Sequence, residues 1–186
     1  MGSLEAIGIL TVLHESAGFV GGYLVTNRWG RPLEFRLSTA VQPNRIQQIL
    51  YGKALQRYVY SDLIGKTLVE KASSSVNFVL TDSDELIDLR HHCRQPVFHV
   101  YSCREALPVD QSPLAATDVN DQRSNAASSM LFGSYHFQCH PDYSTDYDCL
   151  QKYAQQLHEM DFNELFQRVR EALQEARKLG ATQRAA

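Results

Sequence analysis

One stretch, residues 18–71, constrains the fold more than any other part of the chain. It contains two β-rich runs on either side of a short turn, followed by a long segment with helical periodicity. The first run, Phe19–Val25, carries apolar side chains on both faces, which is typical of a strand buried on both sides. Residues 26–32 contain Asn, Gly and Pro, which favour a turn. We therefore predict an antiparallel hairpin here.

The second run of this hairpin alternates apolar and polar side chains, which predicts a half-buried strand. The apolar set is Leu33, Phe35 and Leu37, and the polar set is Glu34, Arg36 and Ser38. We expect the apolar set to face the core and the polar set to form an ionic outer face.

A helical segment follows, with Asn44 as its N-cap and Pro43 preventing extension backward. Its apolar residues recur at a spacing near 3.6 and predict one face packed on the sheet. They are Ile46, Ile49, Leu50, Ala54, Leu55, Val59, Leu63, Ile64, Leu68 and Val69. Gly52 and Gly65 each cost about 1 kcal/mol relative to Ala inside a helix, so we expect a break near Gly52 or Tyr60.

The remaining pattern completes a mixed α/β fold. A strand at residues 6–13 would form an antiparallel β-meander with the hairpin, because the connections are short. Strands at residues 76–80 and 97–101, with a helix at about 84–92 between them, predict a βαβ unit. The order is therefore a meander, helices, a βαβ unit and a C-terminal helical segment.

The composition changes at Arg104 and divides the chain into three parts. Residues 4–103 are expected to form a mixed α/β core domain with a sheet of about five strands. Residues 104–129 are poor in large apolar side chains, which predicts a flexible linker or loop that a protease would cut first. Residues 130–180 are expected to add a short strand, at 130–137, and helices that pack on the core or on a partner.

Two helices are predicted in that last part. The first covers residues 142–160. The second, Phe162–Leu179, has the clearest apolar stripe in the chain, with Asp161 as a cap and Gly180 after its end.

The charge distribution is uneven but mild. Residues 1–72 contain 8 basic and 5 acidic residues, and residues 73–186 contain 10 and 16. The basic excess in the first part is too small to indicate a nucleic-acid-binding tail. There is no long apolar run that predicts a membrane segment and no recognisable secretion signal. We therefore expect a cytoplasmic protein whose four cysteines, Cys93, Cys103, Cys139 and Cys149, are reduced.

The histidine and cysteine residues raise the question of a metal site, since imidazole and thiolate suit zinc. The candidates are His91, His92, Cys93, Cys103, His136, Cys139 and His140. No Cys-x-x-Cys and no established ligand spacing is present. We therefore expect neither a metal ion nor a cofactor, and would seek a zinc site first at Cys93, Cys103, Cys139 and His140.

A strand ending in Asp82-Ser83-Asp84 resembles the first motif of haloacid-dehalogenase phosphatases. In that family the carboxylates hold magnesium and one of them is the nucleophile. The Gly-Thr that should follow is Glu85-Leu86 here. Capping of the next helix explains these acids better. A metal-dependent phosphate-processing enzyme using Asp82 and Asp84 is one alternative function.

Basic and aromatic residues on the hairpin and the helical segment form the candidate binding surface. They are Arg28, Trp29, Arg31, Arg36, Lys53, Arg57 and Tyr58. Such residues anchor protein partners, and they also stack bases and neutralise phosphates. A third interpretation is that the Trp29 tip packs on its own domain. No nucleophile, base and oxyanion arrangement can be assembled from the motifs.

We therefore expect a non-enzymatic protein-interaction or regulatory scaffold module with a protein partner or as a homo-oligomer. A nucleic-acid-binding accessory protein is another alternative.

Two resemblances point the same way. The block GGYLVTNRWGRPLEFRLSTAVQPNRIQQILYG, continued by SDLIGKTLVEKA, resembles a family of uncharacterised bacterial proteins over about residues 6–100. This resemblance implies a bacterial, cytoplasmic origin and no particular activity. The order of apolar strand, Gly-containing turn, strand and helix is also similar to roadblock and longin-type modules, which are regulatory and scaffolding domains.

Overall fold

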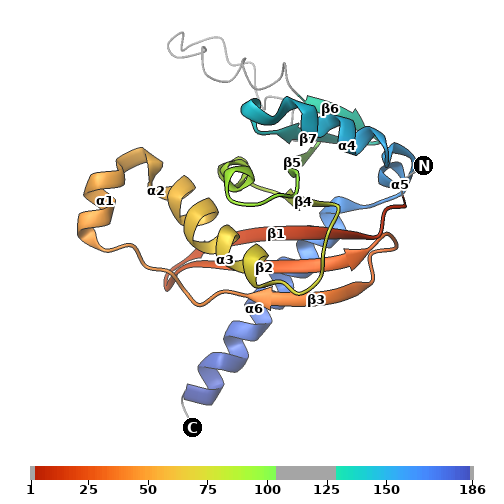
Figure 1. The fold of residues 1–186 in the computed structure, drawn as a ribbon. Coiled ribbons are helices and arrows are strands. Elements are labelled where there is room, and N and C mark those ends of the chain that lie inside the picture. Colours follow the sequence, from red (N-terminus) through yellow and green to blue (C-terminus); the bar gives the residue numbers. More distant parts are fainter. Residues whose placement is uncertain (1–2, 104–128, 185–186) are drawn as a thin grey trace, which may run out of the picture.

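The computed structural model describes residues 3–103 and 129–184 (Figure 1). Its centre is a seven-stranded sheet in the order β3-β2-β1-β4-β5-β7-β6. The strands are β1 (Ala6–Glu15), β2 (Gly18–Asn27), β3 (Pro32–Leu37), β4 (Phe78–Thr81), β5 (Val97–Ser102), β6 (Ser129–Phe132) and β7 (Tyr135–Cys139). The mixed α/β class is confirmed. The predicted linker lies outside the described residues except for Ser129, which begins β6.

The predicted antiparallel meander is confirmed. β1 pairs with β2 along its full length, and β2 pairs with β3 across a turn in which the Gly30 N–H donates to the Asn27 carbonyl. Five strands lie within residues 4–103, as expected. β4 and β5 are parallel to each other, and β4 is also parallel to β1.

Two predicted elements differ from the structure around this parallel pair. The connection between β4 and β5 is the 3-10 helix η3 (Asp84–His91), not an α-helix. The single strand predicted at residues 130–137 is a hairpin, β6 and β7, with a turn at Gly133, whose positive φ suits a tight turn. Because β7 pairs with β5, the sheet continues across the compositional change at Arg104.

The two adjacent glycines of β2 allow helices to approach both faces of the sheet. A Cβ atom at Gly21 would collide with Ile64 on one face, and a Cβ atom at Gly22 would collide with Val169 and Leu173 on the other. Close packing in a strand therefore explains this pair.

The helical segment on the first face breaks at Gly52, as predicted. It consists of α1 (Arg45–Tyr51), η1 (Gly52–Ala54), α2 (Leu55–Arg57), the π-helix η2 (Tyr58–Gly65) and α3 (Lys66–Lys71). From η2 onward the apolar stripe is buried against β1 and β2, through Val59, Ile64 and Leu68. The expectation that the whole stripe packs on the sheet is wrong for α1, none of whose residues is buried.

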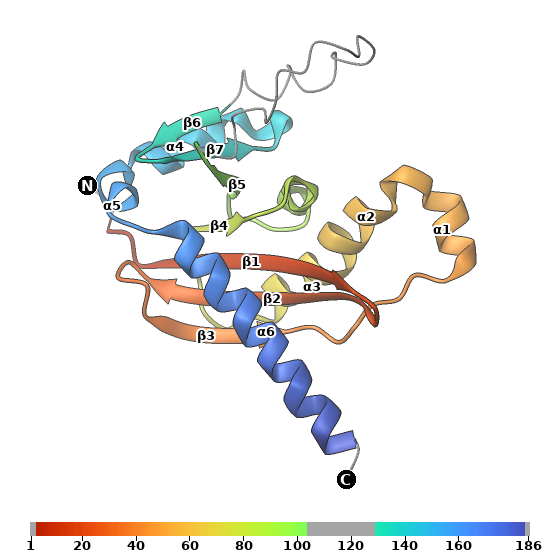
Figure 2. The same ribbon diagram turned by 180° about the vertical axis from the view of Figure 1, so that it is seen from behind.

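The second face carries the C-terminal helices (Figure 2). They are η5 (Pro141–Asp146), α4 (Tyr147–Gln151), α5 (Ala154–His158) and α6 (Phe162–Arg184). The helix predicted at 142–160 is thus broken into three pieces. α6 crosses β1 and β2 and buries Leu165, Val169 and Leu173. No helix in the described part of the chain is long and apolar enough to cross a membrane.

The predicted orientation of β3 is wrong. Leu33, Phe35 and Leu37 are exposed, whereas the Glu34 carboxylate is largely covered. β3 is an edge strand, and the contacts of α6 are mainly with β1 and β2, so the apolar side of β3 lacks a cover among the described residues. Glu34 instead accepts hydrogen bonds from the backbone N–H groups of Ser73 and Ser74 after α3.

Candidate binding surfaces

The structure places the seven predicted binding residues in three locations. Arg28, Trp29 and Arg31 lie at the turn between β2 and β3, and Arg36 lies on β3. Lys53, Arg57 and Tyr58 lie on the helical segment at the opposite end of the sheet (Figure 1). The seven residues therefore belong to separate surfaces.

The turn between β2 and β3 is held in place by hydrogen bonds. The Asn27 side-chain oxygen accepts from the N–H groups of Trp29 at 3.0 Å and Arg31 at 3.1 Å. The Arg168 guanidinium of α6 donates to the Gly30 carbonyl at 2.6 Å. The turn is thus ordered within its own chain, which lowers the entropy cost of presenting its side chains to a ligand.

Trp29 is 69% exposed, so it does not pack into its own domain. The Arg28 guanidinium carbon lies 4.1 Å from the centre of its ring, a cation–π contact. A hollow of about 500 Å³ lies between this turn and the start of α6, with Trp29, Met160 and Leu165 in its lining. Glu159 also lines it. This turn combines an aromatic anchor with cations and a neighbouring hollow.

At the other end of the sheet, α1 is a short helix with both ends stabilised locally. The Asn44 side chain accepts from the Gln47 N–H at 2.8 Å, and the Gln47 side chain accepts from the Asn44 N–H at 3.0 Å, which is a capping box. Gly52, with a φ of 49°, ends the helix and donates its N–H to the Gln48 carbonyl. These caps offset the weak intrinsic stability of so short a helix.

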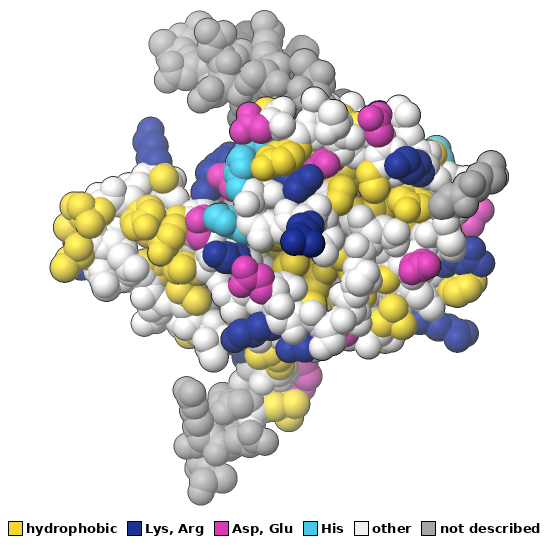
Figure 3. Space-filling model, in the orientation of Figure 1, with side chains coloured by type: hydrophobic (Ala, Val, Ile, Leu, Met, Phe, Trp, Pro, Cys, Tyr) yellow, Lys and Arg dark blue, Asp and Glu magenta, His cyan; other side chains and the backbone are white. Residues whose placement is uncertain are grey.

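Three aliphatic side chains on α1 are exposed to solvent. Ile46 is 68%, Ile49 65% and Leu50 76% exposed. Their spacing of i, i+3 and i+4 places them on one face of the helix. Hydrophobic side chains gather at the end of the molecule formed by α1 and α2 (Figure 3). This aliphatic face is the largest departure from the apolar-inside pattern on any described helix.

We call residues 44–58 the α1 arm. Its link to the body is aromatic and aliphatic: Tyr51 stacks on Tyr58 with ring centres 4.2 Å apart, and Leu55 packs against the core. A hollow of about 400 Å³ lies between the arm and the β1–β2 turn, with Phe19 and Leu55 in its lining. From α1 itself only Gln48 lines this recess, so the recess is separate from the aliphatic face.

The charges of the α1 arm are of one sign. Between Glu34 and Asp62 the sequence contains basic residues and no acidic residue. Arg57 is neutralised by Asp84 at 3.4 Å and Asp88 at 3.2 Å. Within residues 3–103 and 129–184, no ion pair involves Arg45 or Lys53.

The remaining charged candidates have partners of their own. Arg36 forms an ion pair with Glu34 at 2.5 Å. Asp82 pairs with Arg170 of α6 on one face of the sheet, whereas Asp84 pairs with Arg57 of α2, whose segment packs on the other face.

Asp82 is also largely buried, and this burial raises the pKa of its carboxyl group. Asp82 and Asp84 each have a separate arginine partner.

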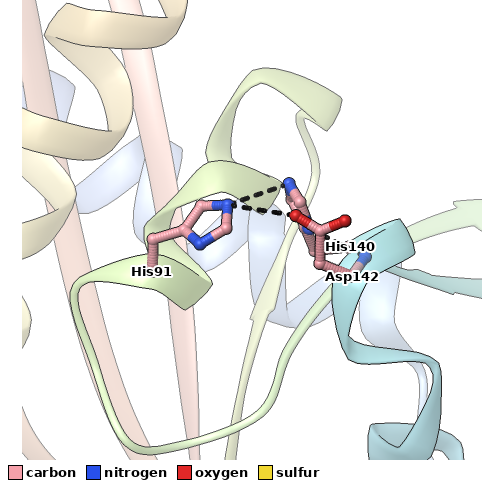
Figure 4. A group of neighbouring side chains, drawn as sticks. All are labelled: His91, His140 and Asp142. Carbon is pink, nitrogen blue, oxygen red and sulfur yellow. Dashed lines mark hydrogen bonds and ion pairs between the residues drawn. The ribbon is translucent and has the colours of Figure 1, made fainter.

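The histidine inventory contains one cluster. In the described residues, His91, His140 and Asp142 are the only His, Cys, Asp or Glu group of three or more close enough to share a metal ion (Figure 4). The set in which a zinc site would be sought first, Cys93, Cys103, Cys139 and His140, is not brought together. Burial raises the pKa of the Cys93 thiol to about 11, and burial also raises the pKa of Cys139, so neither thiol is disposed to ionise.

Sequence reasoning assigned Ile46, Ile49 and Leu50 to the core and so missed their exposure. Two signals were present: the N-cap and Gly52 confine α1 to seven residues, and no acid lies near its cations. Asp142 was missed as a neighbour of His91 because the two are far apart in the sequence.

Comparisons with known protein families, curated proteins and solved structures find no match to this chain.

Proposed function

We propose that this chain is a non-enzymatic protein-interaction module that presents the α1 arm to an apolar, acid-rimmed groove on another protein. The observation that carries the proposal is the exposure of Ile46, Ile49 and Leu50 on a helix with no buried residue. Aliphatic residues at this spacing are the anchors of helix-in-groove recognition.

Burial of these three side chains provides the affinity. Removing an aliphatic side chain from water is favourable by roughly 1.5–3 kcal/mol, before the costs of association are subtracted. The capping box and Gly52 order the helix in the free chain, so less entropy is lost on binding. Tyr51 and Tyr58 extend the apolar surface beside it.

The charge of the arm favours a particular kind of partner. Arg45 and Lys53 stand at the two ends of the aliphatic face and would pair with carboxylates around the groove. A second copy of α1 is disfavoured, because antiparallel pairing would bring Arg45 of one copy close to Lys53 of the other.

Nucleic acid is also disfavoured as the ligand. The aliphatic side chains have no role in phosphate binding, and Arg57 already has two carboxylate partners.

A cytoplasmic scaffold or regulatory role completes the proposal. Its support is that Cys93, Cys103, Cys139 and Cys149 are all free thiols, as expected in a reducing compartment. The exposed aliphatic face of α1 favours assembly with a partner, because large apolar patches on an isolated chain promote association.

Photo-crosslinking in the native cell tests the proposal. A photoreactive residue at position 49 should form one discrete adduct, and mapping should place it in an apolar groove with carboxylates at its rim. The same residue at position 131 is the matched control, because Leu131 is also an exposed aliphatic residue, 55% exposed against 65% for Ile49, and lies on the edge strand β6, outside the α1 arm.

The identified partner should then bind the purified chain at equal stoichiometry, less tightly at higher salt. Adducts only with copies of this chain, only with lipid, or equally from position 131 would contradict the proposal. Loss of binding in a Trp29→Ala, Arg31→Ala double variant but not in Ile49→Asp would assign docking to the β2–β3 turn instead.

A further inference from the structure

A second feature, distinct from the α1 arm, lies where η3 meets the end of β7. His91 is the last residue of η3, and His140 follows β7 directly. Their Nε2 atoms face each other at 3.1 Å (Figure 4). An Asp142 carboxylate oxygen lies 4.0 Å from His91 Nε2, and an Asp88 oxygen lies 3.7 Å from His140 Nε2. Two imidazole nitrogens and the Asp142 carboxylate thus converge, and the Asp88 carboxylate lies beside His140.

We propose that this cluster is a binding site for a divalent transition-metal ion of the zinc class, with His91 and His140 as the nitrogen ligands. Two zinc–nitrogen bonds of about 2.0–2.1 Å at a tetrahedral angle separate their nitrogens by about 3.3 Å. The observed 3.1 Å is close to that separation. Imidazole favours zinc, nickel or copper over magnesium or calcium, which prefer all-oxygen ligand sets.

The surrounding contacts orient both rings. The Tyr143 hydroxyl lies 3.3 Å from His91 Nδ1, which fits a His91 tautomer with its proton on Nδ1 and Nε2 free to bind an ion. His140 Nδ1 accepts from the Asp142 N–H at 3.2 Å, which places its proton on Nε2 in the metal-free chain. Metal binding at Nε2 requires that proton to move to Nδ1, which breaks the hydrogen bond from the Asp142 N–H; an Asp142 carboxylate oxygen 3.7 Å from Nδ1 would then accept the new N–H.

Asp142 supplies a third ligand, and Asp88, which lies beside His140 but outside the group of three, adds compensating charge. Asp142 is on the side of His140, and Asp88 is one turn before His91 on η3. Two arginines lie near the site. Arg57 contacts Asp88, whereas Arg90 lies over the Tyr143 ring and forms an ion pair with Asp146. The charges of the two carboxylates and of these two arginines cancel. The affinity for the metal ion therefore depends mainly on the two imidazole ligands.

The consequence of occupancy would be a link between two parts of the chain that are far apart in sequence. His91 lies on the connection from β4 to β5, and His140 lies between β7 and η5. An ion bound to both would hold η3 to the end of β7 and stabilise the folded state by its binding free energy. This inference departs from the expectation of no metal ion, which rested on sequence spacing alone.

Calorimetric titration of the metal-free full-length chain with zinc chloride tests the site. We expect one zinc ion per chain and a raised Tm. His91→Ala should abolish both effects, and Asp142→Asn should weaken binding. Substitution by Co²⁺ should give the visible absorption of a tetrahedral nitrogen and oxygen site.

His92→Ala is the matched control, because His92 is the next residue but turns away to Asp62, 3.0 Å from its Nε2. This variant should bind zinc like the wild type. Absence of stoichiometric zinc binding, or equal loss in His92→Ala and His91→Ala, would overturn the proposal and leave the cluster as a hydrogen-bonded chain.

Discussion

Helices α1 and α6 carry the same sequence signal and have opposite surroundings. Both have aliphatic residues at helical spacing and a cap at the N-terminus. In α6, Leu165, Val169 and Leu173 are buried against the sheet, whereas in α1 Ile46 and Ile49 are exposed. Periodicity therefore shows that a helix has an apolar face, but it does not show whether that face is covered by the same chain or by another molecule.

The difference arises from length and from where each helix is attached. α6 spans residues 162–184 and crosses β1 and β2, which provide a flat surface beside Gly22. α1 ends after seven residues at Gly52, before the segment reaches the sheet. The buried part of its stripe begins at Val59, in η2.

The largest predicted effect is in α6. Leu165→Ala should lower the free energy of unfolding by about 2–5 kcal/mol, because it leaves a cavity in the core between α6 and the sheet. Urea denaturation followed by circular dichroism measures this change. A loss below about 1 kcal/mol would mean that α6 is not a core element, and the contrast with α1 would fail.

A smaller, local effect is expected at the cap of α1. Asn44→Ala removes the side-chain oxygen that accepts from the Gln47 N–H, while the backbone N–H of residue 44 can still donate to Gln47, and should cost about 1 kcal/mol of helix stability. Hydrogen exchange should increase at residues 47–51 and stay unchanged in α6. Equal acceleration in both helices would show that α1 unfolds only with the whole domain, contrary to a locally stabilised arm.

The C-terminal end of the same helical segment is anchored by Glu34, and the pH dependence of stability tests this anchor. Hydrogen bonds from the Ser73 and Ser74 backbone lower the pKa of Glu34 from 4.5 to about 2. Because the folded-state pKa is the lower one, this stabilisation is complete at neutral pH and is lost as the pH falls from about 4.5 to about 2.

Wild type should therefore exceed Glu34→Gln in stability at pH 6, and the difference should shrink toward pH 2.5. Chemical denaturation of the two proteins across that range measures the difference. A constant gap would show that the Glu34 carboxylate does not hold the end of α3.

The smallest effect on stability is expected at Ile49. Ile49→Ala should change the free energy of unfolding by less than about 0.5 kcal/mol, because the side chain is exposed in the free chain. The same urea titration used for Leu165→Ala gives the comparison directly. A loss approaching that of Leu165→Ala would mean that the aliphatic face of α1 is covered within the chain.

The sequence predicted the meander, the break at Gly52 and the Asn44 cap, because each depends on local conformational preference. It failed for β3, where alternation identified two faces correctly but could not show that α6 covers β1 and β2 instead. The predicted binding residues were dispersed for a similar reason, since the β2–β3 turn, which contains Trp29, and the segment between α1 and α2, which contains Lys53, lie at opposite ends of the sheet.

The His91–His140 pair depends on the antiparallel pairing of β5 and β7, a long-range contact. Spacing along the chain could not predict that pairing, so the cluster was visible only in the folded structure.

The central claim is that α1 binds another protein through its aliphatic face. The most direct measurement is the Kd of the crosslinked partner, once identified, for Ile49→Ala and for its matched control Leu131→Ala. Burial of an aliphatic side chain is worth roughly 1.5–3 kcal/mol, so Ile49→Ala should weaken binding by about 10- to 100-fold while Leu131→Ala leaves it unchanged. Equal affinities for the two variants would contradict the account.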